Sequence, residues 1–210
     1  MSIKRNKTTL YLPFKGTWAV FWGGDTKKLN VHHDVDNQKF AFDFDALNNK
    51  GKRYKRKGKN NKDFYSFGKK ILSPADGMVV ETIDGVRDNN PGSMNPYSAI
   101  GNAVIIRHRK DEFSVFAHLK QKSIKVKPKD KVKQGQIIGL CGNSGNSSEP
   151  HLHYHLQDNE IIQKAKGIKC YFRNVLVKNK QGELYKKEYS PIKGDIIMKW
   201  TGKTGHEIPI

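Results

Sequence analysis

A run of histidines is the feature of this sequence best suited to chemistry. Residues 150–156 read PHLHYHL. Neighbouring side chains on a β-strand point to opposite faces, so His151, His153 and His155 share one face while the leucines and the tyrosine share the other. A core would bury the apolar face and leave three imidazoles together on the opposite one. Imidazole is the commonest neutral zinc ligand, so this run predicts a metal site rather than unrelated structural histidines.

A second group of metal-binding residue types lies upstream. His32 and His33 are followed by residues 38–45, QKFAFDFD, in which phenylalanines alternate with small or acidic residues. On a strand this alternation places Asp43 on the face opposite three aromatic rings. A catalytic zinc site needs three protein ligands and an open position for water, and one strand rarely supplies all three. Asp43 beside the histidine pair would complete a His/Asp/His site.

The remaining histidines are weaker candidates when each is taken alone. His118 ends an apolar run, where a histidine is more often a surface or capped residue. His108 follows the apolar run at 103–106 and is interpreted as structural. His206 lies in a segment that reads as a tail and is assigned no role.

The elements that would carry these residues read as short strands. Runs rich in Val, Ile and Phe, bounded by Gly, Pro, Asn or charged turns, predict strands over residues 77–83, 102–109, 112–119, 136–141, 168–177 and 196–200. Residues 109–111 would close a hairpin. No stretch shows a sustained helical period, so the expected class is all-β with long connections.

Length and composition limit the remaining choices. The 210 residues fit one domain, which we divide into an N-terminal segment at 1–29 that packs on the domain, a β domain at 30–200 and a tail at 201–210. The net charge of +19 attracts polyanions, such as nucleic acid, anionic lipid or acidic wall polymers, without choosing among them. Cys141 and Cys170 lack a zinc-binding spacing and are expected to be two buried thiols.

The ends and loops add two expectations. The N-terminus has no continuous apolar region and no small-residue cleavage site, so no secretory signal is identified, and no apolar stretch is long enough to span a bilayer. Residues 48–62 are rich in Gly, Asn and basic side chains and read either as a solvated loop or as a basic wall beside a binding cleft. Residues 88–99 contain two prolines and read as an ordered loop.

Taken in order, these motifs resemble the lysostaphin-type zinc metallopeptidases, the peptidoglycan endopeptidases. The matching segments are FAFDF at 40–44, LSPADGMV at 72–79, GNAVIIRH at 101–108, FAHL at 116–119, VKQGQIIG at 132–139 and GNSGNSSEPHLH at 142–153. The resemblance covers residues from about 30 to 158. It implies antiparallel β-sheets of the duplicated hybrid motif, with long loops that form an open groove.

The resemblance also implies roles for individual residues. Asp43 and His153 match zinc ligands, and His151 and His118 match the two non-ligand histidines beside the metal. The family usually places the first ligand four residues before the Asp, where this chain has Lys39. Relatives with a longer loop carry that ligand further upstream, a position that His33 would fill. His32 is the alternative, and His155 is a further alternative ligand or a residue behind the ligands.

The implied activity is zinc-dependent hydrolysis of peptide bonds in the stem or cross-bridge of peptidoglycan. His151 or His118 would act as general base and acid, with His151 preferred as the base. The alternative is a catalytically inactive lysostaphin-like scaffold or a cell-wall-binding protein. Peptidoglycan peptides and anionic wall polymers are the expected partners, at the cell envelope or outside the cell. Specific nucleic-acid binding is not expected, because the basic segment lacks interleaved stacking aromatics on a strand.

Overall fold

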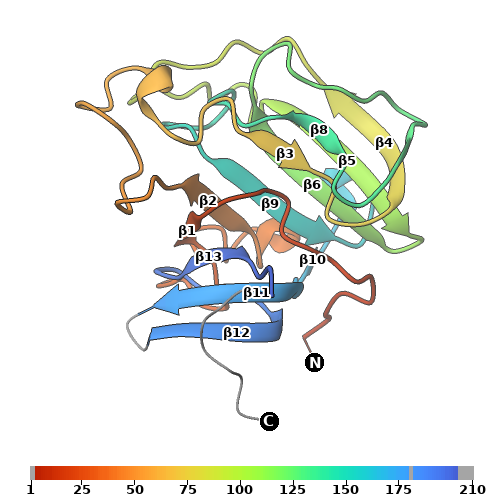
Figure 1. Cartoon of the computed structure of the whole chain (residues 1–210). Helices are drawn as coiled ribbons and strands as arrows, with labels where there is room; N and C mark the ends of the chain where they lie inside the picture. The colour runs from red at the N-terminus through yellow and green to blue at the C-terminus, as the bar shows by residue number, and fades with distance from the viewer. Residues whose placement is uncertain (1–2, 180–181, 203–210) are drawn as a thin grey trace.

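The computed structural model describes residues 3–179 and 182–202, and its regular structure is almost entirely β (Figure 1). The strands are β1 (Trp18–Trp22), β2 (Phe42–Ala46), β3 (Lys70–Leu72), β4 (Gly77–Ile83), β5 (Asn102–Arg109), β6 (Glu112–Leu119), β7 (Lys131–Val132), β8 (Ile137–Leu140), β9 (Leu152–Gln157), β10 (Gly167–Ile168), β11 (Phe172–Asn179), β12 (Gly182–Tyr189) and β13 (Ile196–Lys199). Three short 3-10 helices occur: η1 (Asp36–Gln38), η2 (Asn61–Asp63) and η3 (Ile162–Lys164). No α-helix occurs in the described ranges, and the predicted all-β class is confirmed.

The strands form two sheets. The large sheet has 11 strands in the order β12-β11-β13-β1-β2-β9-β6-β5-β4-β7, with β10 paired to β9 beside this path. β3 and β8 form a separate antiparallel pair, which Figure 1 shows above β5 and β6. Every strand pairing within these sheets is antiparallel. The centre of the large sheet is β2-β9-β6, the strands that carry most of the candidate site residues.

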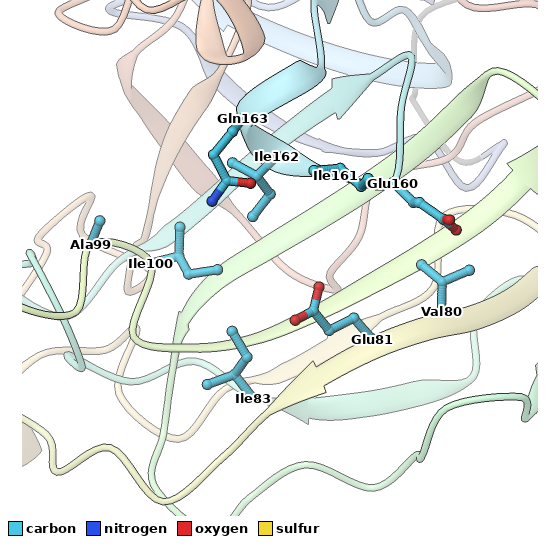
Figure 2. Close-up of a pocket in the computed structure, with 9 residues that line it drawn as sticks. All are labelled: Val80, Glu81, Ile83, Ala99, Ile100, Glu160, Ile161, Ile162 and Gln163. Carbon is cyan, nitrogen blue, oxygen red and sulfur yellow. The ribbon is translucent and has the colours of Figure 1, made fainter.

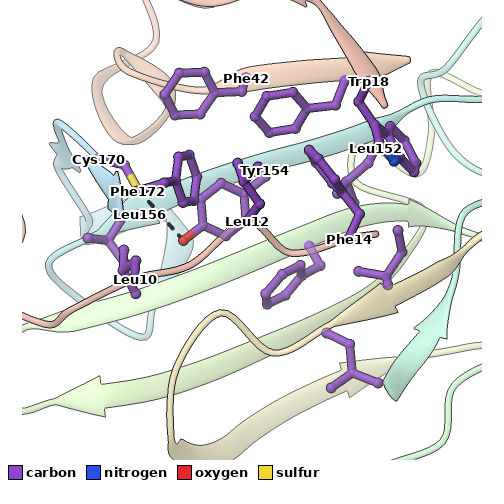
Figure 3. Packing of buried hydrophobic residues seen from close by; sticks show 14 of the residues in the cluster. Leu10, Leu12, Phe14, Trp18, Phe42, Leu152, Tyr154, Leu156, Cys170 and Phe172 are labelled. Atoms are coloured by element: carbon purple, nitrogen blue, oxygen red, sulfur yellow. Dashed lines mark hydrogen bonds between the residues drawn. The ribbon is translucent and has the colours of Figure 1, made fainter. Parts of the chain in front are cut away.

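The core forms on one face of these central strands. Phe42 of β2 and Tyr154 of β9 are almost fully buried, together with Phe14 and Trp18 from the N-terminal segment (Figure 3). Phe44 of β2 belongs to the same buried cluster. Burying a side chain of this size stabilises the fold by roughly 1.5–3 kcal/mol. Because side chains alternate along a strand, the same packing turns the intervening residues of β2 and β9 to the opposite face.

Most predicted strands occur where the sequence indicated them. β4, β5 and β6 have the expected bounds, and β8 and β13 lie within the predicted ranges. The run predicted as one strand at 168–177 is instead divided between β10 and β11. The chain between them bonds to the N-terminal segment: the Lys169 amide donates to the Lys4 carbonyl, and the Tyr171 amide donates to the Asn6 side chain. These long-range bonds explain the interruption.

The two ends of the chain differ in how they relate to the domain. Within the predicted segment 1–29, β1 lies inside the large sheet, between β13 and β2. Of the predicted tail at 201–210, residues 203–210, including His206, lie outside the described residues. Cys141 and Cys170 are buried and not bridged, as expected. Among the described residues no helix is long and apolar enough to cross a membrane.

Candidate metal centre

Two strands bring a carboxylate and an imidazole together. β2 and β9 pair so that Asp43 stands directly opposite His153. Both point away from the aromatic core, because their strand neighbours Phe42, Phe44 and Tyr154 fill it. His153 Nδ1 lies 2.9 Å from Asp43 Oδ1, and both residues are buried.

The third member of the group comes from a turn before η1. Asn30 fixes this turn: its buried amide donates to the carbonyls of residues 24, 39 and 41, and its Oδ1 accepts from the His32 amide. His32 Nε2 then lies 3.0 Å from Asp43 Oδ2. The ligand atoms of His32, Asp43 and His153 all lie within 4.8 Å of one another. Two imidazoles and one carboxylate form a donor set that suits zinc.

His33 does not belong to this group. Its Nδ1 lies 3.2 Å from Oδ1 of Asp34. The structure therefore differs from the expectation that His33 supplies the first ligand, and it brings the alternative, His32, to Asp43. The physical reason is that successive residues of a tight turn point in different directions, and Asn30 determines which of them faces the strand.

Hydrogen bonds behind His153 determine which of its nitrogens faces Asp43. The Gln157 amide donates to the Asn159 carbonyl, which turns its Oε1 toward His155 Nε2 at 2.9 Å. A carbonyl oxygen only accepts, so His155 carries its proton on Nε2. Neutral His155 therefore accepts at Nδ1, and the donor is His153 Nε2, 3.0 Å away. Neutral His153 then directs the lone pair of Nδ1 at the Asp43 carboxylate. Two acceptors that face each other in this way fit a bound cation between them.

The electrostatic environment favours the same protonation states. Burial alone would raise the pKa of Asp43, but the charge interactions with His151 and His32 and the hydrogen bond from His32 outweigh burial and hold that pKa well below its ordinary value. Burial lowers the pKa of His153, and it lowers the pKa of His155 to about 3. An ionised carboxylate and a neutral imidazole are the forms in which these residue types bind a metal.

Two further histidines lie beside the group. The ring centroids of His118 and His151 are 5.0 Å apart, and His151 Nε2 lies 3.6 Å from Asp43 Oδ1. Nδ1 of His118 donates to the Ser144 carbonyl at 2.8 Å, and Nδ1 of His151 donates to the Glu149 carbonyl at 2.8 Å. Each neutral ring therefore keeps Nε2 as its proton acceptor. Burial holds the pKa of His118 well below its ordinary value.

The glycine-rich loop before β9 positions His118. His118 adopts a left-handed backbone conformation with φ of 58°, which costs an L-residue about 1–2 kcal/mol. Contacts on both sides hold it: its amide donates to the Ile100 carbonyl and its ring donates to the Ser144 carbonyl. The glycine-rich loop and the segment before β5 approach each other too closely for side chains at these two glycines. A Cβ on Gly145 would lie 2.4 Å from the Gly101 nitrogen.

These groups line a cleft of about 630 Å³. Its walls include His32, Asp43, His118 and His151, and the structure adds residues to which sequence reasoning gave no role at the site: Phe21, Trp22, Val31, Asp45, Arg53, Met94 and Ser147. Alternation along β2 placed Asp45 on the same face as Asp43. Arg53 belongs to the segment 48–62, which the sequence offered as a possible basic wall beside a cleft. No local pattern indicated that β1 or residues 88–99 would contribute to the cleft.

A second hollow of about 520 Å³ lies elsewhere, between β4 and the segment that contains η3 (Figure 2). Its aliphatic lining includes Ile83, Ile100 and Ile162, with the carboxylates of Glu81 and Glu160 at its walls. None of the histidines lines it. The chemistry that the sequence predicted is therefore confined to the cleft at β2 and β9.

His108 lies apart from that cleft. Its Nδ1 donates to the Asp76 carbonyl at 2.8 Å and its Nε2 lies 2.9 Å from Ser114 Oγ, so the ring bridges β5 to a turn and to β6. Burial lowers its pKa. These contacts agree with the structural interpretation.

Comparisons with known proteins can now be set beside this geometry. Peptidoglycan DD-endopeptidase ShyA of Vibrio cholerae is 33% identical over 117 residues, which cover 55% of this chain and 23% of the relative. Endolysin 2638A of Staphylococcus phage 2638A is 35% identical over 79 residues, which cover 36% of this chain and 16% of the relative. The chain thus spans about a quarter or less of the length of these relatives. The solved catalytic domain of lysostaphin from Staphylococcus simulans is 21% identical, with 78% of this chain and 88% of that chain covered and a TM-score of 0.40.

The chain also matches a protein family. The family described as "Peptidase family M23" matches residues 60–165, about half of the chain. This range contains His118, His151 and His153, whereas His32 and Asp43 precede it. The match and the histidine geometry agree that the chain belongs to peptidase family M23.

Proposed function

We propose that this chain is a zinc-dependent endopeptidase that hydrolyses peptide bonds in the stem or cross-bridge of bacterial peptidoglycan. The observation that carries the proposal is the His32, Asp43 and His153 group in an open cleft, with His118 and His151 beside it. Family membership and relatives named as peptidoglycan DD-endopeptidases support it. The site of action would be the cell envelope or its exterior.

The proposed zinc ligands are His32, Asp43 and His153. His155 contacts His153 from behind and is assigned the role of fixing its proton on Nε2. A bound zinc ion would supply an acidified water and a Lewis acid for the scissile carbonyl. The residues of this chain then have to orient the peptide, move protons and balance the charge that develops.

His151 and His118 are the proposed proton-transfer residues. Each has Nδ1 engaged with a backbone carbonyl, so Nε2 is the nitrogen that can accept a proton and later return it to the leaving amine. His151 is preferred as the base because its Nε2 lies nearer the metal group, 3.6 Å from Asp43 Oδ1. His118, when protonated, would stabilise the developing oxyanion.

The positive charge of the chain suggests a second contact with the cell wall. The net charge of +19 and the exposed basic side chains of residues 48–62 favour binding to anionic wall polymers. This contact would concentrate the enzyme at its substrate without taking part in the chemistry. An inactive wall-binding scaffold is the less favoured alternative, because every residue of the proposed site is present.

Incubation with purified peptidoglycan tests the proposal. Zinc-loaded protein should release peptide fragments that mass analysis can identify, and protein treated with a chelator should release none until zinc is restored. Asp43→Ala should remain inactive at all zinc concentrations. Wall binding without any released fragment from zinc-loaded wild type would instead support the scaffold.

A further inference from the structure

Arg53 differs from the other basic residues of the 48–62 segment. Its side chain turns into the cleft, with Nε 2.8 Å from Asp45 Oδ2 and Nη2 donating to Glu149 Oε2 at 2.6 Å. The approach to Asp45 is an ion pair without hydrogen-bond alignment. The guanidinium also lies 4.9 Å from the ring centroid of Phe21. By contrast, the side chain of Arg56 in the same segment is 80% exposed.

Both acidic partners of Arg53 belong to segments that carry site residues. Asp45 is on β2, two residues after the proposed ligand Asp43, and its side chain is only 2% exposed. Glu149 lies two residues before His151 in the loop that leads into β9. One guanidinium therefore ties the metal-binding strand to the loop of the proposed base.

The backbone of Glu149 has a direct contact with the base. Its carbonyl accepts the Nδ1–H of His151 at 2.8 Å and the Ser147 hydroxyl at 3.0 Å. This carbonyl keeps the His151 proton on Nδ1 and leaves Nε2 as the acceptor that faces the metal group. A shift of residue 149 away from His151 would weaken the hydrogen bond that holds this proton.

We propose that Arg53 is a positioning residue for the reaction: by holding the Glu149 side chain against Asp45, it keeps the Glu149 carbonyl on Nδ1 of His151. It acts through Glu149 and does not contact the reacting atoms. This inference rests on the proposed function for its kinetic consequences, but the placement of the His151 proton can be tested without any activity.

The kinetic test uses variants that separate the two-sided contact of the Arg53 guanidinium from its positive charge. Arg53→Gln and Glu149→Gln should each lower kcat about 10-fold on a soluble peptidoglycan fragment, the lower end of the loss seen when partners that orient a site residue are removed. KM should change less than twofold and zinc content should be normal. The double variant should be no slower than Arg53→Gln, because that single variant already breaks the contact between Arg53 and Glu149. Arg53→Lys should recover part of the lost kcat, and Arg56→Gln is the matched control with unchanged kinetics.

Nitrogen-15 NMR of histidine-labelled protein supplies the independent measurement. In the wild type His151 should show its proton on Nδ1, and in Arg53→Gln the signal should change toward a mixture of the two tautomers. A rise in KM alone would show that Arg53 binds substrate directly and would overturn the proposal. Unchanged kcat in Arg53→Gln, or an unchanged His151 tautomer there, would also overturn it. If wild type fails to cleave peptidoglycan, the proposed function falls, while the NMR comparison still decides the role of Arg53.

Discussion

The buried row of rings behind the metal group should make the metal-free protein sensitive to acid. Burial, together with the nearby His153, lowers the pKa of His155 to about 3, against 6.5 for an ordinary histidine. The unfolded chain therefore binds this proton more tightly than the folded chain. The stabilisation that His155 contributes is complete above about pH 6.5 and is lost as the pH falls toward 3.

The size of the effect follows from the same two pKa values. Between pH 6.5 and pH 5 there are about 1.5 pH units at 1.36 kcal/mol each, so His155 alone should reduce the free energy of unfolding by roughly 2 kcal/mol at pH 5. This is a large part of a typical domain stability of about 5–15 kcal/mol. His118 and His153, whose pKa values are also lowered, change stability in the same direction.

Urea unfolding in the presence of a chelator, at pH 8 and pH 5, measures this effect. His155→Gln should be less stable than wild type at pH 8, because it disturbs the core, but its loss between the two pH values should be smaller by roughly 2 kcal/mol. Ile168→Val on β10 is the matched control: it trims a fully buried side chain opposite Leu156 and adds no titratable group. Relative to wild type, Ile168→Val should lower the free energy of unfolding by about 0.5–1.5 kcal/mol, and by the same amount at both pH values. A His155→Gln curve parallel to wild type would refute the reasoning.

Three other predictions concern metal, catalysis and wall binding. His32→Ala should lose zinc by metal analysis while His33→Ala keeps about one per chain, because of these two histidines His32 is the one that contacts Asp43; the reverse result would restore His33 as the ligand. His151→Ala and His118→Ala should keep zinc and lose turnover by roughly 10²-fold or more, and full activity of His151→Ala with normal zinc would refute its role as base. Replacing four exposed lysines of the 48–62 segment with glutamine should weaken binding to intact walls and its salt dependence without slowing cleavage of a short neutral peptide, whereas slower cleavage would place them in the reaction. The four are Lys52, Lys55, Lys57 and Lys59.

The sequence was most informative where strand alternation and chemistry coincide. The run at 151–155 and the Phe/Asp alternation around Asp43 each specify a face, and pairing of two such strands is enough to bring Asp43 to His153. The same rule also explains why the core was predictable around Phe42 and Tyr154. These features depend on neighbours in sequence, so one sequence suffices to find them.

The choice between His32 and His33 could not be made in this way. The turn that carries them is held by Asn30, whose amide reaches carbonyls of residues 39 and 41 across the turn. Arg53 was hidden for a similar reason, since its partner Glu149 lies 96 residues away in sequence. β12 was missed because its residues, GELYKKEY, are mostly exposed and carry no apolar run. For the histidine turn and for Arg53, a contact distant in sequence determines the local structure.

The N-terminal segment contributes more to the site than packing alone. β1 pairs with β2 so that Trp22 stands opposite Asp43, and Phe21 and Trp22 form part of the cleft wall. With β1 on one side and β9 on the other, β2 is an internal strand whose five residues are all buried. An internal strand has both edges hydrogen-bonded, which restricts the movement of Asp43 relative to His153. Because β1, His32 and Asp43 all precede residues 60–165, the candidate site joins histidines from the family-matched range to residues of β2 and of the turn before η1, which lie outside that match.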